Sequence, residues 1–366
     1  MPTPGPRISV SITSHGYGHL TQTMAVLSAL RKRQKDVQFR IQCTQNLERA
    51  ARSMVDFKFT HCESSPDVGL IQPDPINVDL PATYAEYSRF HNQFERSVKT
   101  ESEELKKWSA DMVISDISYR SLAAAANASI TSIAIASLSW DHIVKRYFDL
   151  TQTEPAIWYQ QMCEAYAQTT LALLPEPALA PYHFEHSRHI PPLLLKGHAI
   201  CDFRPALGIQ PDDERPIVFC SLGGIPASQL PLSAMEKEDA YHWLINFDQG
   251  RSANNMHFLH EINNWPYRDI MASVNAVVGK PGYCTAVEAA AYELPFVFTQ
   301  RGHFPDEQPI TNWLKDNARA VELTNEEWFA GRFADALREA FNLDKKEAPV
   351  CNGAEVAAAL IQQHLE

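Results

Sequence analysis

Short apolar segments alternate with helix-like segments along this chain, and the alternation runs through it twice. In the first half the strand-like segments are residues 8–13, 37–43, 57–63, 111–116 and 131–137, and residues 172–177 end this half. In the second half they are residues 216–222, 275–280, 295–300 and 319–323. Such runs, with helices between them, are typical of parallel strands buried on both faces. We therefore predict an α/β protein with two doubly wound, Rossmann-like domains facing a cleft, and with ligand groups at the carboxyl ends of the strands.

The length of the chain also favours two domains, because 366 residues exceed an ordinary single domain. Residues 175–216 are rich in proline and histidine and weakly periodic, which predicts a linker region. We expect a first domain in residues 1–195 and a second in residues 196–345. Residues 346–366 are expected to form a C-terminal helix that is either solvated or packed back on the first domain.

Composition restricts the classes of partner. The net charge of −12 argues against binding to nucleic acid or to anionic lipid. No apolar run reaches the roughly 18–20 residues of a membrane span, and the opening MPTPGPR lacks the apolar segment of a signal peptide. Seven cysteines without a CxxC pair are expected to be reduced thiols. These features together predict a cytoplasmic protein.

The stretch SHGYGH places two histidines and two glycines in a strand-to-helix turn. Gly16 and Gly18 allow a sharp turn, and the helix start that follows offers N–H groups to an anion, although such glycines also serve purely to connect elements. His15 and His19 lie at the ligand-facing end of the first strand. Histidine often serves as a general base, and His19 is the stronger candidate, whereas His15 can equally be solvated.

Asp116 ends the apolar segment MVISD, again at the carboxyl end of a predicted parallel strand. One interpretation is an N-cap for the helix that begins near Tyr119. The other is a carboxylate that orients and charges a nearby imidazole. The two roles are compatible.

A second glycine turn, SLGG, follows the first strand of the second domain. Ser221, Gly223 and Gly224 make a plausible phosphate cradle ahead of a helix. The sequence has no Walker lysine and no full GxGxxG, which argues against a P-loop NTPase and a dinucleotide-dependent enzyme.

Residues 272–313 run from a strand through a glycine turn, a helix and a second strand into the acidic segment Asp306-Glu307-Gln308. This block resembles the donor-binding region of inverting GT-B glycosyltransferases, such as UDP-glycosyltransferases and the N-acetylglucosaminyltransferase of peptidoglycan synthesis. It is most similar to the GT-B-like module at the N-terminus of L-arabinokinase-type proteins, in which a KxGYxTxxEAxAxxLPFVF stretch occurs. The residues that fit this pattern are Lys280, Gly282, Tyr283, Thr285, Glu288, Ala289, Leu294, Pro295 and Phe296.

The resemblance implies a GT-B fold in which residues 1–195 form the acceptor side and residues 196–345 bind a nucleotide sugar. It implies that His19 is the catalytic base and Asp116 its partner. It also implies that Glu288 holds the ribose hydroxyls, and that Glu307 and Gln308 hold the donor sugar. The remaining donor-binding candidates are Gly18, Ser221, Gly223, Gly224, Lys280, Gly282, Tyr283 and Thr285, with His15 and Asp306 as possible additions.

Two departures from the family pattern are visible. Gln308 and Asn312 are one residue further apart than in the usual QxxN, and Lys280 replaces a frequent histidine in the diphosphate loop. A lysine there can still neutralise phosphate charge. Retaining enzymes often carry a glutamate at the position of Lys280, so the lysine favours an inverting reaction.

The sequence thus predicts a metal-independent inverting glycosyltransferase that uses a nucleotide sugar, with UDP the expected nucleotide, and no further cofactor. The acceptor, a small molecule, lipid or glycan, has no pattern in the sequence; the segments 64–81 and 140–159 are expected to be loops that shape its site. Alternatives are a sugar-nucleotide epimerase or hydrolase and a catalytically silent sensor of nucleotide sugars. His183, His186 and His189 would share a helix face, as zinc ligands can, but polar linker residues explain them equally well.

Overall fold

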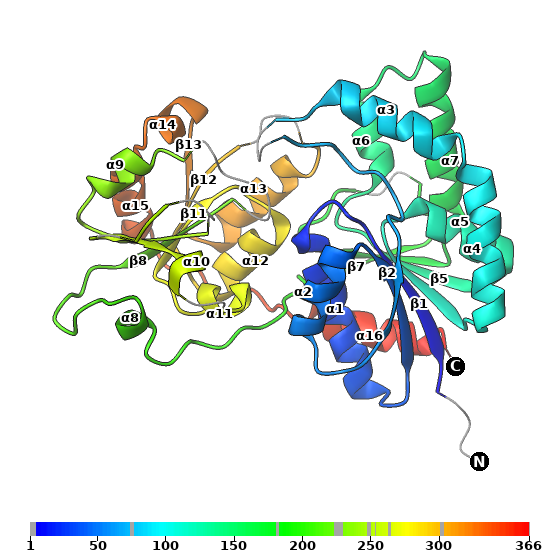
Figure 1. Ribbon diagram of the computed structural model, residues 1–366, viewed down its shortest axis with the longest axis horizontal. Helices are drawn as coiled ribbons and strands as arrows, with labels where there is room; N and C mark the ends of the chain where they lie inside the picture. The colour runs from blue at the N-terminus through cyan, green and yellow to red at the C-terminus, as the bar shows by residue number, and fades with distance from the viewer. Residues whose placement is uncertain are drawn as a thin grey trace.

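Two parallel sheets, lying side by side, form the body of the protein (Figure 1). The computed structural model describes residues 5–73, 77–180, 183–222, 230–246, 250–252, 254–262, 265–300 and 304–365. Within these ranges the first sheet has the strand order β3-β2-β1-β4-β5-β6-β7 and the second has the order β10-β9-β8-β11-β12-β13. The chain therefore has the predicted α/β architecture.

The strands of the first sheet are β1 (Arg7–Ile12), β2 (Gln38–Cys43), β3 (Thr60–Glu63), β4 (Met112–Asp116), β5 (Thr131–Ile135), β6 (Leu171–Pro175) and β7 (Ser187–Ile190). Its helices are α1 (Tyr17–Arg33), α2 (Gln45–Met54), α3 (Leu80–His91), α4 (Phe94–Trp108), α5 (Tyr119–Ala128), α6 (Trp140–Tyr147) and α7 (Thr153–Ala167). Strand β4 is buried along its whole length, and β5 is buried from its second residue onward, because helices cover both faces of the sheet (Figure 1).

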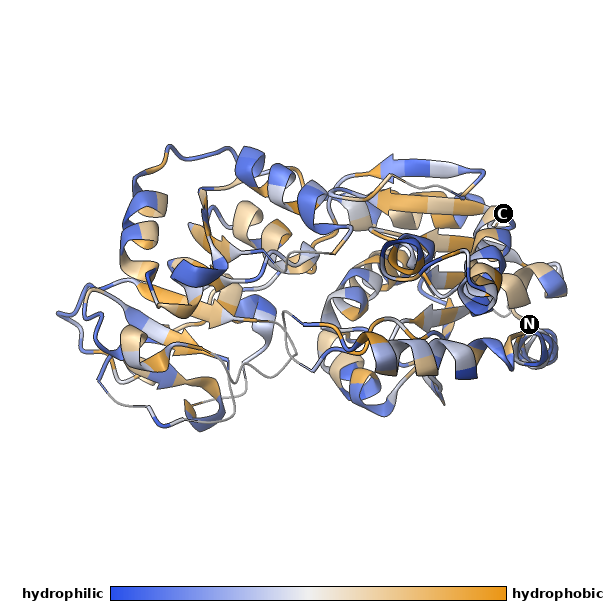
Figure 2. Ribbon diagram, turned by 90° about the horizontal axis from the view of Figure 1, so that it is seen from above, coloured by the Kyte–Doolittle hydropathy of each residue, from blue (hydrophilic) through white to orange (hydrophobic). Residues whose placement is uncertain are grey.

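The second sheet consists of β8 (Ile217–Ser221), β9 (His242–Ile245), β10 (Met256–Phe258), β11 (Ala276–Gly279), β12 (Phe296–Thr299) and β13 (Ala320–Leu323). The helices of this half are α8 (Phe203–Ala206), α9 (Leu232–Glu236), α10 (Leu259–Ile262), α11 (Tyr267–Met271), α12 (Tyr283–Ala291), α13 (Glu307–Asn317), α14 (Asn325–Phe329) and α15 (Phe333–Asn342). The hydropathy colouring shows the apolar strands enclosed by helices with polar outer faces (Figure 2).

Each sheet changes its winding direction at one place, beside its first strand. β1 lies between β2 and β4, and β8 lies between β9 and β11. At the carboxyl ends of β1 and β4, Ile12 lies opposite Asp116. The carboxyl ends of strands at such a reversal are where doubly wound sheets gather ligand groups.

The last helix, α16 (Gly353–Gln363), returns from the second half and packs against α1 (Figure 1). The N–H of Gly353 donates to the carbonyl of Pro192 at 3.2 Å, and the Arg33 guanidinium donates to the Gln362 amide oxygen at 3.1 Å. Ile361 is buried in this contact. The chain thus crosses twice between its two halves.

Two expectations from the sequence are wrong in detail. Residues 140–159 are not a loop: they form α6 and the first part of α7, whose buried faces carry Trp140 and Trp158. Residues 175–216 are not all linker, because β7 adds an edge strand to the first sheet.

Candidate active site

His19 and Asp116 come together at the carboxyl ends of neighbouring strands, as predicted. His19 is the third residue of α1, which begins directly after the turn at Gly16. Asp116 is the last residue of β4. The Nδ1 atom of His19 lies 2.9 Å from Oδ1 of Asp116, and the two side chains are 12% and 2% exposed.

This contact sets the tautomer of His19. A carboxylate only accepts hydrogen bonds, so Nδ1 carries the hydrogen and donates it to Asp116. The lone pair of the neutral ring is then on Nε2, which can accept a proton. Asp116 does not cap α5, since Ser118 occupies the N-cap position. Of the two roles that the sequence allows for Asp116, the structure therefore shows the contact with an imidazole and not the helix cap.

The pKa of His19 is raised above its ordinary value of 6.5. Burial is the largest single influence and opposes the charged ring, but the charge and hydrogen bond of Asp116, together with the charges of Asp67 and Asp306, outweigh it. The imidazolium that forms when His19 takes a proton is thus stabilised by three carboxylates from different parts of the chain.

His15 lies beside His19 and has a different environment. The N–H of Leu70 donates to its Nδ1 at 3.3 Å, so the hydrogen of the neutral ring lies on Nε2. Its ring meets Trp140 edge to face at 5.3 Å, and the His15 and His19 centroids are 6.5 Å apart. Gly69 has φ +68°, and a Cβ there would lie 2.9 Å from the His15 ring nitrogen, so the loop approaches this closely only with glycine.

Asp67 and Trp140 are part of this site; both lie in the segments 64–81 and 140–159, but the sequence does not identify either residue individually. Asp67 accepts from the Thr13 hydroxyl at 2.6 Å and from the Trp140 Nε1–H at 2.9 Å. Burial raises the pKa of Asp67 to about 6, although its two hydrogen bonds oppose the rise. The loop that carries Asp67 has no periodicity or motif, so its position cannot be deduced from the sequence.

Glu288 is the main candidate of the second domain and lies on α12. Its side chain is almost fully buried, and its Oε2 atom has no hydrogen-bond partner in the part of the chain that the structure describes. Burial raises the pKa of Glu288 to about 8, against the opposing charge of Arg268. The neighbouring Thr285 hydroxyl lies 3.3 Å from the Tyr267 hydroxyl.

The two halves touch at their candidate sites. The Cys284 thiol at the start of α12 donates to the Gly18 carbonyl at the start of α1 at 3.3 Å. Phe304, which precedes α13, packs into the aromatic core of the first domain, with its ring 6.5 Å from His15 and 6.4 Å from Tyr147. Asp306 stands at the N-cap position of α13.

The other predicted donor residues are spread over the second sheet edge. Ser221 ends β8, Lys280 follows β11 and Gly282 occupies the N-cap position of α12. Glu307 and Gln308 open α13; Glu307 is buried, and the Gln308 amide donates to Asn312 at 2.7 Å. Gly223 and Gly224 lie outside the described residues.

Tyr283 does not have the predicted place. Its hydroxyl donates to the Glu176 carbonyl at 2.8 Å and accepts from the Leu193 N–H at 3.0 Å. Both groups belong to the chain between β6 and α8, so this hydroxyl ties α12 to the linker instead of facing a donor.

Known proteins resemble this chain in sequence and in structure. No protein-family profile matches the sequence. In sequence, the chain is similar to L-arabinokinase from Arabidopsis thaliana, with 27% identity over 96% of this chain. The chain spans 34% of the length of that relative.

Solved glycosyltransferase structures superpose on nearly the whole chain. UGT89C1 from Arabidopsis thaliana, complexed with UDP, has a TM-score of 0.63 and 14% identity, covering 99% of this chain and 100% of that one. The calicheamicin glycosyltransferase CalG4 has a TM-score of 0.63 and 13% identity, covering 98% of both chains. MurG from Acinetobacter baumannii has a TM-score of 0.57 and 13% identity, covering 98% of this chain and 100% of that one. The protein has the GT-B fold.

Two absences hold for the described part of this GT-B chain. No cluster of histidine, cysteine or acidic side chains there is arranged to hold a metal ion. His189 lies in strand β7 and His186 directly precedes it, so neither is on a helix. The ring nitrogen Nε2 of His183 is 3.0 Å from the Tyr159 hydroxyl. None of the helices in the same ranges has the length and apolarity to cross a bilayer.

Proposed function

We propose that this GT-B protein is an inverting glycosyltransferase that moves a sugar from a nucleotide sugar, expected to be UDP-linked, to an acceptor hydroxyl. The observation that carries the proposal is the 2.9 Å contact between His19 Nδ1 and Asp116 Oδ1. It orients the ring with Nε2 as the proton acceptor. A base of this kind contributes roughly 10²–10⁴-fold to the rate.

The proposed reaction is a single displacement. The acceptor O–H gives its proton to His19 Nε2 while its oxygen forms a bond to the anomeric carbon. The bond from that carbon to the diphosphate oxygen breaks, and its electron pair leaves with the nucleotide. Asp116 stabilises the imidazolium, as a buried carboxylate does when it accepts from the far ring nitrogen. The products are an inverted glycoside and a nucleoside diphosphate.

In this proposal residues 1–195 hold the acceptor and residues 196–345 hold the donor. Glu288 accepts hydrogen bonds from the ribose hydroxyls. Backbone N–H groups at the start of α12 and the ammonium of Lys280 stabilise the charge that develops on the diphosphate. UDP is favoured as the nucleotide because it is bound in the similar UGT89C1 structure, although the similar VinC structure holds dTDP.

One observation favours a second candidate, a module that binds a nucleotide sugar without transferring it. The sequence relative, similar over 96% of this chain, is named for a kinase and not for a glycosyltransferase. In that case the donor site would be kept while the pair formed by His19 and Asp116 would have no acceptor to activate.

The deciding experiment follows UDP release from labelled UDP-sugars, with and without a panel of hydroxyl acceptors. The proposal expects acceptor-dependent release in the native protein and its loss in His19→Ala. Nucleotide-induced stabilisation in a thermal-shift assay, which mass action requires of any ligand of the folded state, identifies the donor first. Stabilisation by a nucleotide sugar with no turnover for any acceptor would favour the binding module.

A further inference from the structure

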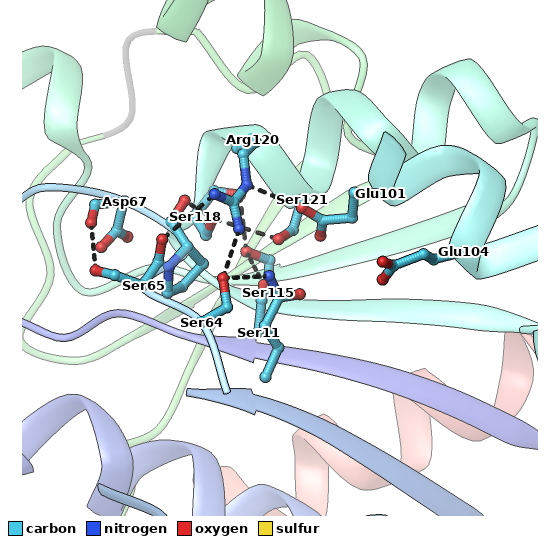
Figure 3. Close-up of polar contacts among 12 residues, drawn as sticks. Ser11, Ser64, Ser65, Asp67, Glu101, Glu104, Ser115, Ser118, Arg120 and Ser121 are labelled. Carbon is cyan, nitrogen blue, oxygen red and sulfur yellow. Dashed lines mark hydrogen bonds and ion pairs between the residues drawn. The ribbon is translucent and has the colours of Figure 1, made fainter. Parts of the chain in front are cut away.

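The loop after β3 is held to the first sheet by a buried polar network (Figure 3). The Arg120 guanidinium donates to Glu101 at 2.9 Å and to the Ser64 hydroxyl at 3.1 Å. The Ser118 hydroxyl donates to the carbonyl of Pro66 at 3.0 Å. This network joins the loop to α4 and α5, and so determines where the next residue, Asp67, lies.

Asp67 extends from this loop to both sides of the histidine turn. Its Oδ1 accepts from Thr13, whose hydroxyl oxygen in turn accepts from the His15 N–H at 3.4 Å. Its Oδ2 accepts from the indole of Trp140, whose ring contacts the ring of His15. One buried carboxylate therefore connects the turn before α1 to the start of α6.

We propose that Asp67 is a positioning residue for the histidine turn: it orients Thr13 and Trp140 around His15 and His19, and its charge stabilises the protonated ring of His19. The proposal rests on the function proposed above, in which that ring takes a proton.

A purely structural role does not explain why the residue is an acid. Two buried carboxylates, Asp67 and Asp116, disfavour each other's ionisation, and a neutral group could accept the same hydrogen bonds at lower cost. The cost is offset when a cation forms between them. His19 is the group that becomes a cation in the proposed reaction, so a second acid here favours the transition state more than the resting protein.

The titratable groups around His19 come from several elements. Asp116 comes from β4, Asp67 from the loop after β3, Asp306 from the start of α13, His15 from the adjacent turn, and Cys284, which interacts with Asp116, from α12. Around Asp67 itself stand the buried hydroxyls of Tyr87, Tyr119 and Tyr166. Asp67 is thus one of three acids that raise the pKa of His19, and its share is separable by substitution.

The test is an NMR titration of the imidazole of His19 in protein labelled with [¹³Cε1]histidine, with the signal assigned by its loss in His19→Ala. Asp67→Asn should lower the pKa of His19 relative to the native protein. Trp140→Phe removes the hydrogen bond that favours the charged form of Asp67, so it should lower that pKa in the same direction by less. Glu104→Gln, which removes an acid with a side chain 50% exposed on the same domain, is the matched control and should change nothing.

This readout does not depend on turnover, so it separates the two proposals. If the native protein transfers sugar, Asp67→Asn should also reduce kcat by about 10- to 100-fold, the loss that follows from a misplacement of about 1 Å, with the KM for the donor little changed. If the native protein has no activity, the function proposed above fails while the titration still decides the role of Asp67. An unchanged pKa of His19 in folded Asp67→Asn, or in Trp140→Phe if Asp67→Asn does not fold, overturns the inference.

Discussion

The ligand-facing edges of the two sheets differ in how many hydrogen bonds their buried acids accept. In the first domain both oxygens of Asp67 accept hydrogen bonds, from Thr13 and Trp140, and Oδ1 of Asp116 accepts from His19, whereas Oδ2 of Asp116 has no hydrogen-bond partner among the described residues. In the second domain the Oε2 atom of the buried Glu288 carboxyl accepts no hydrogen bond from any described group, and burial raises the pKa of Glu288 to about 8.

This difference in hydrogen bonding indicates different roles for the two sites. A buried polar group without a hydrogen bond costs free energy, so it is retained where a ligand supplies the partner. By this argument the contact between His19 and Asp116 is formed before substrate arrives, as general-base chemistry requires, whereas the carboxyl of Glu288 gains its hydrogen bonds from the nucleotide. Four predictions test this comparison.

Replacing the base should have the largest effect. His19→Ala removes the proton acceptor while leaving the second domain intact, so turnover should fall by roughly 10²–10⁴-fold with donor affinity little changed. Steady-state kinetics and calorimetry with the donor measure the two quantities. Asp116→Asn should cost less, and the double variant should be scarcely slower than His19→Ala, because groups that act as a unit are not additive.

Equal turnover in the native protein and His19→Ala would refute this assignment of the base. It would leave His15 as the candidate or support a module without chemistry. The matched control is His186→Ala, which removes a histidine from the exposed approach to β7 and should leave turnover unchanged.

The stability of the first domain should depend on the ion pair between Arg120 and Glu101, which joins α5 to α4. Arg120 and Glu101 are 2.9 Å apart, with side chains 12% and 11% exposed. Arg120→Met leaves the Glu101 charge buried without its partner and should lower the free energy of unfolding by about 3 kcal/mol. Urea denaturation measures this change.

A second substitution sharpens that experiment. Adding Glu101→Leu to Arg120→Met removes the unpaired charge and should restore most of the stability, because buried pairs are often replaceable by apolar residues. Arg338→Met, which breaks an exposed pair with Asp335, is the control and should change stability by less than about 1 kcal/mol. A loss in the double variant as large as in Arg120→Met would mean that the Arg120 contacts to the loop matter and the ion pair does not.

The same comparison explains what the sequence could and could not predict. The strand, glycine turn and helix that carry Glu288 are contiguous, so local pattern predicts them, and β11 and α12 follow the predicted order. His19 and Asp116 are far apart in sequence, but His19 lies at the start of the helix that follows β1 and Asp116 ends the neighbouring parallel strand β4, so the fold class predicts that they meet.

No such rule predicts the positions of Asp67 and Cys284. Asp67 is placed by a buried network that joins a loop to α4 and α5, and Cys284 reaches Gly18 only because the two domains pack together. These positions follow from tertiary contacts between segments without a shared period. The helices α6 and α7 are not predicted for a different reason: residues 140–159 show no recognisable pattern in the sequence and are expected to be a loop.

Nucleotide binding should depend on the ionisation of Glu288. Ribose hydroxyls donate, so they favour the ionised carboxylate, and binding should release a proton from a group whose free pKa is about 8. Affinity for UDP should therefore rise as the pH increases from 6 to 8. Glu288→Gln should bind at least tenfold more weakly at pH 8, the effect of losing hydrogen bonds of ~1.5–3 kcal/mol each to a charged group.

Isothermal titration calorimetry in buffers of different ionisation enthalpy measures both the affinity and the proton release. Glu293→Gln, which replaces an exposed acid just after α12, is the control and should keep the native pH dependence. The same pH dependence in Glu288→Gln would mean that another group releases the proton, and that the second domain is no less preorganised than the first.

The smallest expected effect is a shift of the pH–rate profile. His19 must be neutral to accept a proton, and its pKa in the free protein is raised above 6.5 by Asp116, Asp67 and Asp306 against the opposing effect of burial. The acid limb of kcat/KM should therefore lie above pH 6.5, since activity is lost as the pH falls through the pKa of the folded protein. Asp116→Asn removes the largest favourable charge while leaving burial in place, so the limb should move to lower pH. A profile of kcat/KM for the acceptor against pH in both proteins, with acceptor well below its KM, locates the two limbs. An acid limb that stays at the same pH in Asp116→Asn would show that a group other than His19 titrates. The acids around His19 would then not be the feature that distinguishes the first domain from the second.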